Sequence, residues 1–270
     1  MINNVLITGS SGFIGTNLCD YIKKNSDINI YYADKSTGIS VEFLDNLQNI
    51  DFVVHLAALP GVQDCKNNFQ SAVLDNICSA FSVFRIAHKH KVPVIFTSSM
   101  AAANPQENLY SSIKAIIEIE AKRINSVGGD IRIIRLSNVY GGIGFMERKF
   151  TVVRNFLKAR EEGKDLVING DGSQIRDFIH VKDVCKLIFK YMMLETGWNY
   201  PIDIGTGIGT SVLDLAKMIY NNEKVFTFDK NSDIIGPKSS IVDPKPAFEK
   251  LNFVAKRKLE DYIKEGENHV

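Results

Sequence analysis

A glycine-rich turn between a short apolar run and an amphipathic segment restricts the fold more than any other feature of the sequence. Val5–Thr8 is typical of a buried strand, and Gly12–Lys24 carries apolar side chains at helical spacing. The turn itself reads Gly9-Ser-Ser-Gly12-Phe-Ile-Gly15. Three glycines at this spacing allow a tight turn, bare backbone beside a phosphate and close contact between helix and strand. A plain glycine-rich loop is the alternative at this point.

Short apolar or β-branched runs alternate with helical patterns through the first half of the chain. Besides the first strand and helix, we expect strands at 28–33, 52–56, 92–97 and 131–136 and helices at 41–49, 69–90 and 109–127. Strand runs without strict alternation, each followed by a helix, are typical of a parallel sheet covered on both faces. The sequence therefore predicts an α/β protein with a doubly wound parallel sheet of the Rossmann type and a smaller C-terminal lobe.

The pattern loosens after about residue 140. Glycine and proline gather at 200–209 and 236–246, as expected of loops. Strand-like runs are expected at 166–168 and 176–180, and helices at 149–162, 182–194, 212–220 and 257–265. We expect a nucleotide-binding Rossmann domain at 1–145, with elements near 165–204 as candidates to return to it. Residues 146–270 would then form mainly a substrate-binding lobe.

Composition and charge exclude several classes of protein. The 270 residues carry a net charge of +1, so neither nucleic acid nor an anionic membrane is an expected partner. The four cysteines lack CxxC spacing, which argues against a zinc site or a disulfide framework. The N-terminus lacks the basic region of a signal peptide, and no apolar run reaches the ~20 residues of a membrane span. We therefore expect a cytoplasmic enzyme without a metal.

An acidic residue follows the second predicted strand. Asp34 lies about 20 residues beyond the glycines, where a carboxylate can accept hydrogen bonds from the adenosine ribose of a dinucleotide. Because a carboxylate there would repel a 2′-phosphate, NAD is favoured over NADP. Lys35 could partly accommodate that phosphate, so NADP stays open. The structural alternative for Asp34 is a turn residue at the strand end.

A serine, a tyrosine and a lysine occur at spacings that suit proton transfer. Ser99 follows the strand at 92–97, at the carboxyl edge where doubly wound sheets bind ligands. Tyr110 and Lys114 lie four residues apart on the next predicted helix and so face one side. A lysine ammonium near a tyrosine hydroxyl favours the phenolate, which can accept a proton, while Ser99 would hydrogen-bond the reacting oxygen. The alternative is an aromatic packing residue beside a solvated lysine.

Further motifs follow in order along the chain: His55-Leu-Ala-Ala58, Asn76 within a helix, Phe96-Thr-Ser-Ser99, Arg135-Leu-Ser-Asn138-Val-Tyr-Gly141, Gly170-Asp-Gly172, Arg176-Asp-Phe-Ile-His-Val181 and Asp203-Ile-Gly-Thr-Gly207. With the glycine turn and the serine, tyrosine and lysine, they make the chain resemble the extended short-chain dehydrogenase/reductase superfamily. Within it, the resemblance is to the NAD-dependent nucleotide-sugar epimerase/dehydratase family, and to UDP-glucose 4-epimerases in particular.

The resemblance implies a role for each matching residue. The catalytic set would be Ser99, Tyr110 and Lys114. NAD would lie against Gly9, Gly12, Phe13, Ile14, Gly15, Asp34, Lys35, Leu56, Ala57, Ala58, Asn76, Tyr110 and Lys114. A nucleoside-diphosphate sugar would lie against Ser99, Asn138, Arg176 and Lys238. The Arg176 guanidinium suits a diphosphate, although an ion pair with Asp177 or Asp171 is the alternative.

Three departures from the family pattern affect what is expected. Only the 17 residues 35–51 separate Asp34 from the strand at 52–56, so the family's third strand and its adenine-contacting aspartate are missing or shortened. Met100-Ala101 stands where sugar 4,6-dehydratases carry an acidic pair, which disfavours dehydration. The loop at 236–240 has Lys238 where many epimerases place an arginine.

These observations favour an NAD-dependent nucleotide-sugar 4-epimerase that works through a transient 4-keto sugar. A 4-keto-nucleotide-sugar reductase that consumes NAD(P)H is the second reading, and a cofactor-binding protein without turnover is the third. The resemblance also implies a homodimer, formed through the helices around 76–88 and 110–122. Its apolar seam would be Phe81, Phe84, Ile116 and Ile117, unless these side chains are buried within their own chain.

Overall fold

The computed structural model describes residues 2–34, 47–144, 151–220, 226–229 and 236–265. The chain divides into two compact units, and each is described by itself. Unit 1 comprises residues 1–136 and 185–203, and unit 2 comprises residues 137–184 and 204–270. Helix α7 (Val181–Met192) begins in unit 2 and continues in unit 1.

Unit 1 is built on a six-stranded sheet with the order β2-β1-β3-β4-β5-β9. Its strands are β1 (Asn4–Thr8), β2 (Asn29–Ala33), β3 (Phe52–His55), β4 (Val94–Ser99), β5 (Ile131–Leu136) and β9 (Ile202–Ile204). The pairings from β2 through β5 are parallel. The predicted Rossmann sheet is confirmed, and β9 reaches it from a stretch that the sequence had indicated as loop.

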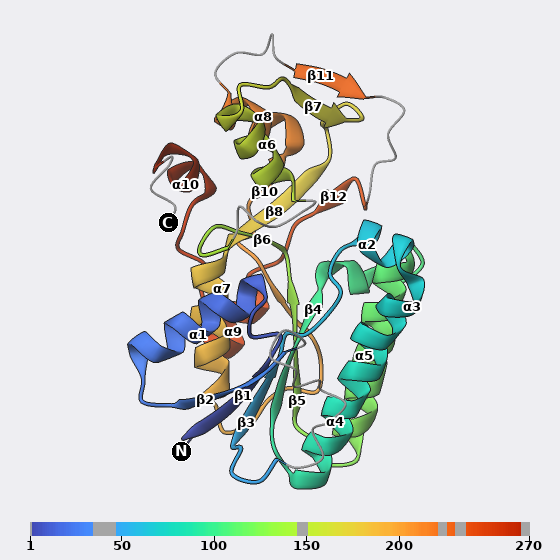
Figure 1. Ribbon diagram of the computed structural model, residues 1–270, viewed down its shortest axis with the longest axis vertical. Helices are drawn as coiled ribbons and strands as arrows, with labels where there is room; N and C mark the ends of the chain where they lie inside the picture. The colour runs from blue at the N-terminus through green and yellow to red at the C-terminus, as the bar shows by residue number, and fades with distance from the viewer. Residues whose placement is uncertain (1, 35–46, 145–150, 221–225, 230–235, 266–270) are drawn as a thin grey trace. The chain divides into compact units, whose positions relative to one another are not determined.

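Helices cover both faces of this sheet. The chain supplies α1 (Phe13–Asn25), α2 (Val62–Asn67), α3 (Phe69–Ala72), η3 (Val73–Cys78), α4 (Ser79–His90), η4 (Met100–Ala103) and α5 (Leu109–Ser126). Helix α1 and the later part of α7 lie on one face, and α4 and α5 lie on the other (Figure 1). The rings of Tyr21 and Phe189 meet at 5.7 Å between α1 and α7.

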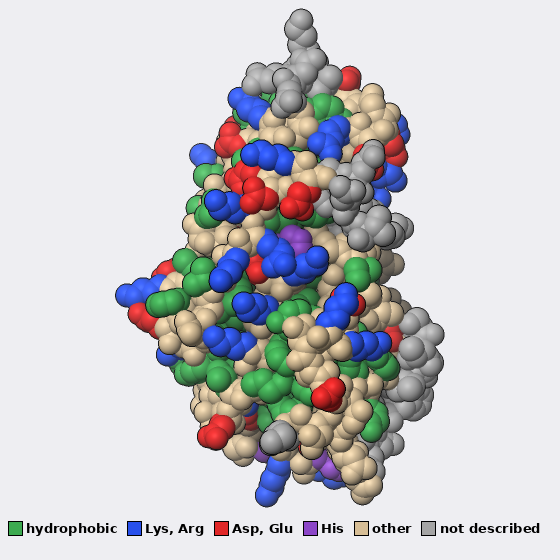
Figure 2. Space-filling view, turned by 90° about the vertical axis from the view of Figure 1, so that its left-hand side faces the viewer, with side chains coloured by type: hydrophobic (Ala, Val, Ile, Leu, Met, Phe, Trp, Pro, Cys, Tyr) green, Lys and Arg blue, Asp and Glu red, His purple; other side chains and the backbone are tan. Residues whose placement is uncertain are grey.

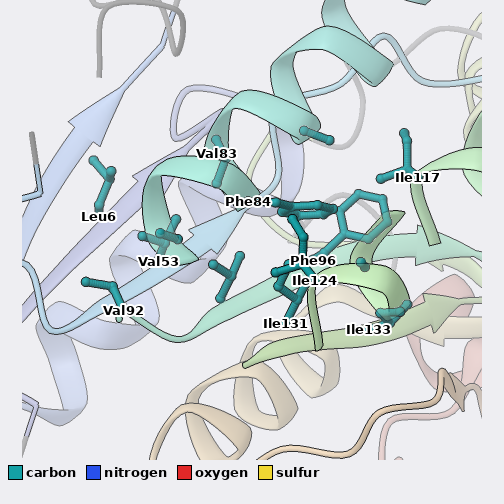
Figure 3. Packing of buried hydrophobic residues seen from close by; sticks show 14 of the residues in the cluster. Leu6, Val53, Val83, Phe84, Val92, Phe96, Ile117, Ile124, Ile131 and Ile133 are labelled. Atoms are coloured by element: carbon teal, nitrogen blue, oxygen red, sulfur yellow. The ribbon is translucent and has the colours of Figure 1, made fainter. Parts of the chain in front are cut away.

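The main core of unit 1 lies between the sheet and the pair α4 and α5. Phe84 from α4 packs against Phe96 from β4 with ring centroids 5.5 Å apart, and Ile117 from α5 closes the same cluster (Figure 3). These three side chains are at most 2% exposed. Because burying each such side chain contributes about 1.5–3 kcal/mol, this cluster holds α4 and α5 on the sheet.

Two expectations about unit 1 are modified by the structure. The predicted helix at 69–90 is continuous but contains the π-helical segment η3, a wider turn that sequence periodicity does not reveal. The predicted helix at 41–49 and the shortened third strand fall mainly on residues 35–46, which lie outside the described residues. Among the described strands, β2 is the edge of the sheet next to that segment.

Unit 2 is organised around strand β8 (Ile175–His180), which pairs with β6 (Asn138–Tyr140), β10 (Gly209–Ser211) and β12 (Ser239–Ser240). A separate pair joins β7 (Leu166–Asn169) and β11 (Phe226–Asp229). The helices are α6 (Val152–Glu161), α8 (Val212–Ile219), α9 (Lys245–Leu251) and α10 (Leu259–Glu265). Strand β12 falls in the expected loop at 236–246, and β10 begins at the last residue of the expected loop at 200–209. Neither was predicted, because both strands are short and depend on β8 for their hydrogen bonds.

The surface carries charges of both signs, interspersed with apolar side chains on the face that Figure 2 shows. This distribution agrees with the net charge of +1. Across the described ranges, no helix combines the length and apolarity required to cross a membrane. The same part of the chain contains no group of three or more His, Cys, Asp or Glu side chains placed to hold a metal ion.

Candidate active site

The glycine turn joins β1 to α1 and leaves no room for side chains. Gly9 has a φ of +68°, and a Cβ there would lie 2.6 Å from the Ala57 backbone nitrogen. A Cβ on Gly15 would overlap the Gly9 carbonyl and the Ser10 backbone. Gly12 is the N-cap residue of α1 and has no side chain to cap the helix. A bare turn leading into a helix N-terminus suits the pyrophosphate of a dinucleotide, and Phe13 and Ile14 form the first turn behind it.

The acidic residue at the end of β2 reaches back to the glycine turn. The Ser11 backbone N–H donates to Oδ2 of Asp34 at 3.1 Å, so the carboxylate lies beside the turn. This placement suits a ribose hydroxyl next to a pyrophosphate. Lys35, the other residue expected near the ribose, lies outside the described residues.

The segment Leu56, Ala57 and Ala58 follows β3 and is tied to β1. The Leu56 N–H donates to the Thr8 carbonyl at 3.1 Å, and the Ala57 N–H donates to Thr8 Oγ1 at 3.2 Å. His55 precedes the segment and is 1% exposed, with Nδ1 2.7 Å from Thr8 Oγ1. Burial lowers the pKa of His55 to about 3, so the ring is neutral and acts as a structural hydrogen-bond partner.

Asn76 holds the end of the same segment. Its Oδ1 accepts a hydrogen bond from the Leu59 N–H at 3.0 Å, and its Nδ2 donates to the Leu59 carbonyl at 3.2 Å. The side chain is 1% exposed and lies in η3, so the wider π turn aims it at this loop. Asn76 therefore fixes the backbone at Leu59, just after the segment Leu56–Ala58.

Ser99 ends β4 and begins the short helix η4. Its Oγ accepts a hydrogen bond from the Ala101 N–H at 3.2 Å. Because the oxygen is used as an acceptor, the hydroxyl hydrogen can be donated to another oxygen. The sequence did not predict η4, whose first residues Met100 and Ala101 give Ser99 this capping role.

Tyr110 and Lys114 are close to each other at the start of α5. The Lys114 Nζ lies 5.8 Å from the centre of the Tyr110 ring and 5.1 Å from that of Phe96, and it donates to the Thr97 carbonyl at 3.2 Å. Lys114 is 4% exposed. Burial lowers the pKa of Lys114 to about 8, against the opposing influence of Cys65 and Glu118. An ammonium that titrates near neutrality beside a tyrosine is suited to proton transfer.

One residue of this site was missed by the sequence analysis. Glu118 lies one turn beyond Lys114 on α5 and is 2% exposed. Its Oε1 accepts from Ser98 Oγ at 2.6 Å. The positions 110, 114 and 118 share one helix face, so a glutamate on the inward face of α5 was the available signal.

Apart from Ser99, which ends β4 in unit 1, the expected substrate residues lie in unit 2, on or beside β8. Asn138 Nδ2 donates to the Asp177 carbonyl at 3.0 Å. Arg176 Nη1 donates to the Ile175 carbonyl at 2.8 Å and to the Pro237 carbonyl at 2.7 Å. Lys238 is exposed, and its carbonyl accepts from the Ile175 N–H at 2.9 Å. Arg176 is thus on β8, Asn138 is on β6, which pairs with β8, and Lys238 directly precedes β12, which also pairs with β8.

The carboxylates considered as partners of Arg176 have other hydrogen-bond donors. Asp177 is fully buried and accepts from the backbone N–H groups of Thr206 and Gly207 at 2.9 Å. Asp171 accepts from the Ser173 N–H at 2.9 Å, which lowers the pKa of its carboxyl group together with the Ser173 hydroxyl. Asp177 thus stabilises the 205–207 turn, and the Arg176 guanidinium is oriented by two carbonyls.

The doubly wound sheet, the bare glycine turn and the aspartate beside it define a dinucleotide-binding protein of the Rossmann type. Residues 5–202 match the NAD dependent epimerase/dehydratase family, and the chain belongs to that family. It is therefore an enzyme with NAD as its cofactor.

Known relatives cover most of the chain. A putative UDP-glucose 4-epimerase of Methanocaldococcus jannaschii is 26% identical over 80% of this chain and 81% of its own length. A dTDP-4-dehydro-6-deoxy-D-allose reductase of Streptomyces bikiniensis is 26% identical over 80% of this chain and 79% of its own. The crystal structure of a UDP-glucose 4-epimerase of Thermotoga maritima with UDP-glucose has a TM-score of 0.84 at 26% identity, covering 97% of each chain. The chain is accordingly an NAD-dependent enzyme that modifies nucleotide sugars.

Proposed function

We propose that the chain is an NAD-dependent nucleotide-sugar 4-epimerase. The observation that carries the proposal is the buried Lys114 beside Tyr110, at the sheet edge where β4 ends in Ser99. The Tyr110 oxygen would take the proton from the C4 hydroxyl of the sugar and return it after the 4-keto sugar has turned. Ser99 would donate its hydroxyl hydrogen to the reacting oxygen, and the Lys114 ammonium would stabilise the tyrosinate.

Bound NAD would supply the hydride acceptor at C4 and then the hydride donor. Unit 1 would hold it with the glycine turn under the pyrophosphate and Asp34 at the adenosine ribose. Leu56, Ala57 and Ala58 would support the nicotinamide half, because Thr8 and Asn76 hold the two ends of that segment. Gly9 and Gly15 support this assignment, because a Cβ at either position would overlap neighbouring backbone atoms.

Unit 2 would hold the nucleotide sugar. Arg176 is the candidate for the diphosphate, because a guanidinium suits a diphosphate and this one is oriented by the carbonyls of Ile175 and Pro237. Asn138 from β6 would add a neutral donor, and Lys238, just before β12, would add a point charge. We therefore propose a cofactor-binding part centred on residues 1–145 and a substrate-binding part mainly in 146–270.

The side chains of η4 favour epimerisation over dehydration. Met100 and Ala101 follow Ser99, and neither side chain can donate or accept a proton in an elimination. A 4-keto-sugar reductase is the second candidate, favoured by the match to the reductase from Streptomyces bikiniensis. Both candidates use Tyr110 for proton transfer: an epimerase uses it first as base and then as acid and regenerates NAD in each cycle, whereas a reductase uses it only as acid and consumes NAD(P)H.

The deciding experiment offers the purified enzyme a panel of UDP-, GDP- and dTDP-sugars, with products resolved by NMR. An epimerase converts at least one donor into its C4 epimer without added reductant, because the hydride returns to the same carbon. A reductase instead leaves these donors unchanged and oxidises NADH or NADPH in the presence of a 4-keto sugar. Absence of an epimer from every donor would refute the leading proposal.

We also propose a homodimer that uses the outer face of α5. The seam expected from the sequence is wrong in part, because Phe84 and Ile117 are fully buried in the core of unit 1. On the same helix Ile116 and Ile119 are 44% and 66% exposed and lie three residues apart.

A single charge on that face is expected to separate the dimer. Ile119→Glu should shift the mass measured by light scattering from dimer to monomer, because an ionised carboxylate is costly to bury in an apolar contact. Ile208→Glu, at an equally exposed isoleucine of unit 2, is the matched control and should leave the mass unchanged. A monomeric parent protein would rule out the dimer.

A further inference from the structure

A buried carboxylate on α5 is the strongest feature that the proposed reaction does not use. Glu118 is 2% exposed, and Arg135 from β5 contacts both of its oxygens, with Nε 2.8 Å from Oε1 and Nη2 2.7 Å from Oε2. Ser98 Oγ donates to Oε1 at 2.6 Å. Three hydrogen bonds, two of them a parallel pair from a guanidinium, hold this side chain in one geometry.

The Ser98–Glu118–Arg135 cluster joins the elements that carry the catalytic candidates. Ser98 immediately precedes Ser99 on β4, and its register partner on β5 is Arg135. Glu118 follows Lys114 by one turn of α5. The Lys114 ammonium in turn donates to the carbonyl of Thr97, the residue before Ser98. Two successive turns of α5 are thus tied to successive residues at the end of β4.

We propose that Glu118 is a positioning residue, which holds the turn of α5 that carries Lys114 against the end of β4 that carries Ser99. The carboxylate also supplies the buried negative charge that keeps Lys114 an ammonium. What the site does with that ammonium rests on the proposed function, but the positioning and the charge are properties of the folded chain alone.

The charges around the cluster determine in which direction the loss of the Glu118 charge moves the pKa of Lys114. The titratable groups around Lys114 are His55 from β3, Cys65 from α2 and, on α5 itself, Tyr110 and Glu118. Glu118 pairs with Arg135, whose Nη1 lies 3.7 Å from Oδ1 of Asp203 on β9. His55 is neutral and the Cys65 thiol has a raised pKa, so Glu118 is the anion on this side of Lys114.

The test measures the titration of Lys114 in the parent protein and in Glu118→Gln. Lysine labelled with ¹³C at Cε gives one NMR signal per side chain, and Lys114→Met identifies the signal of Lys114. We expect Glu118→Gln to lower the pKa of Lys114 by about one unit, since removing a nearby opposite charge disfavours the ammonium. The alkaline limb of the rate profile should move to lower pH by the same amount, because the ammonium is lost earlier as the pH rises.

Two further variants separate positioning from general stability. Glu120→Gln removes a half-buried carboxylate of the same helix, which pairs with Arg123 rather than with the cluster, and should leave both the Lys114 titration and the rate unchanged. Ser98→Ala removes one hydrogen bond without changing a charge, and we expect it to lower kcat roughly five-fold while the pKa of Lys114 stays in place. It also provides the test should Glu118→Gln not fold.

An unchanged Lys114 titration in Glu118→Gln, with only a lower Tm, would overturn the proposal and leave Glu118 a brace of the fold. Full kcat in Ser98→Ala would overturn the positioning role in the same way. If no nucleotide sugar is turned over, the Lys114 titration still decides this inference, and the failure then belongs to the proposed function.

Discussion

Tyr110→Phe is expected to lower the turnover of the nucleotide sugar by about 10²–10⁴-fold, the usual contribution of a general acid–base group. The substitution removes only the hydroxyl, so the ring stays beside the Lys114 ammonium, at 5.8 Å from Nζ. The helix start is retained as well, because it depends on Asn108, whose side chain accepts from the Ser111 N–H. We therefore expect the variant to keep its bound NAD and its Tm.

The measurement compares kcat by NMR of the sugar product with the NAD released on denaturation. Tyr31→Phe is the matched control, because Tyr31 is 47% exposed on β2 and the same oxygen is removed there without consequence for turnover. A Tyr110→Phe protein with parental kcat would contradict the assignment of the proton-transfer group. A variant that also lost its NAD would show instead that Tyr110 acts mainly in cofactor binding.

Arg132→Ala is expected to lower the free energy of unfolding by about 2–6 kcal/mol, because two carbonyl acceptors lose their donor at about 1–3 kcal/mol each. Arg132 is 1% exposed and donates from Nη1 to the carbonyls of Tyr191 at 2.6 Å and Leu194 at 3.0 Å. These carbonyls lie at the end of α7, where a helix leaves its last acceptors unpaired. Nη2 also holds Asp130 at 2.8 Å.

Urea unfolding followed by circular dichroism measures this loss. Arg132→Lys should recover only part of it, because an ammonium cannot reproduce the planar fork that serves several acceptors. Arg123→Ala is the control, since Arg123 forms a similar ion pair with Glu120 on the exposed side of α5 and should change the midpoint little. Equal midpoints for the parent and Arg132→Ala would show that α7 is held by its apolar contacts alone.

Much of the fold could be predicted because its signals are local. Strand β1, the glycine turn and helix α1 lie within 25 residues, and each has a pattern that depends on its own period and turn chemistry. The match is similar for β5 and α5, whose bounds agree with the predicted ones to within one residue. Elements without such a pattern were missed, such as β9 and β10 with three residues each. Their hydrogen bonds come from strands far away in the sequence.

In the candidate site, too, some contacts could be predicted from sequence spacing and others could not. Spacing was enough to bring Tyr110 and Lys114 together, because residues four apart share a helix face. Spacing could not show that Asn76 hydrogen-bonds the backbone of Leu59. Nor could it show that Arg132 donates hydrogen bonds to carbonyls at the end of a helix about 60 residues later. Such partners are chosen by which buried polar groups meet when the chain packs.

By itself, the sequence determined the strand–turn–helix that accepts a dinucleotide and the order of the catalytic candidates along the chain. The tertiary structure alone decided that Lys114 is buried, that Glu118 and Arg135 form an ion pair behind it, and that Phe84 and Ile117 belong to the core rather than to an outer seam. The reason is physical: periodicity reports which face of an element is apolar, whereas burial and pairing depend on what the rest of the chain places against that face.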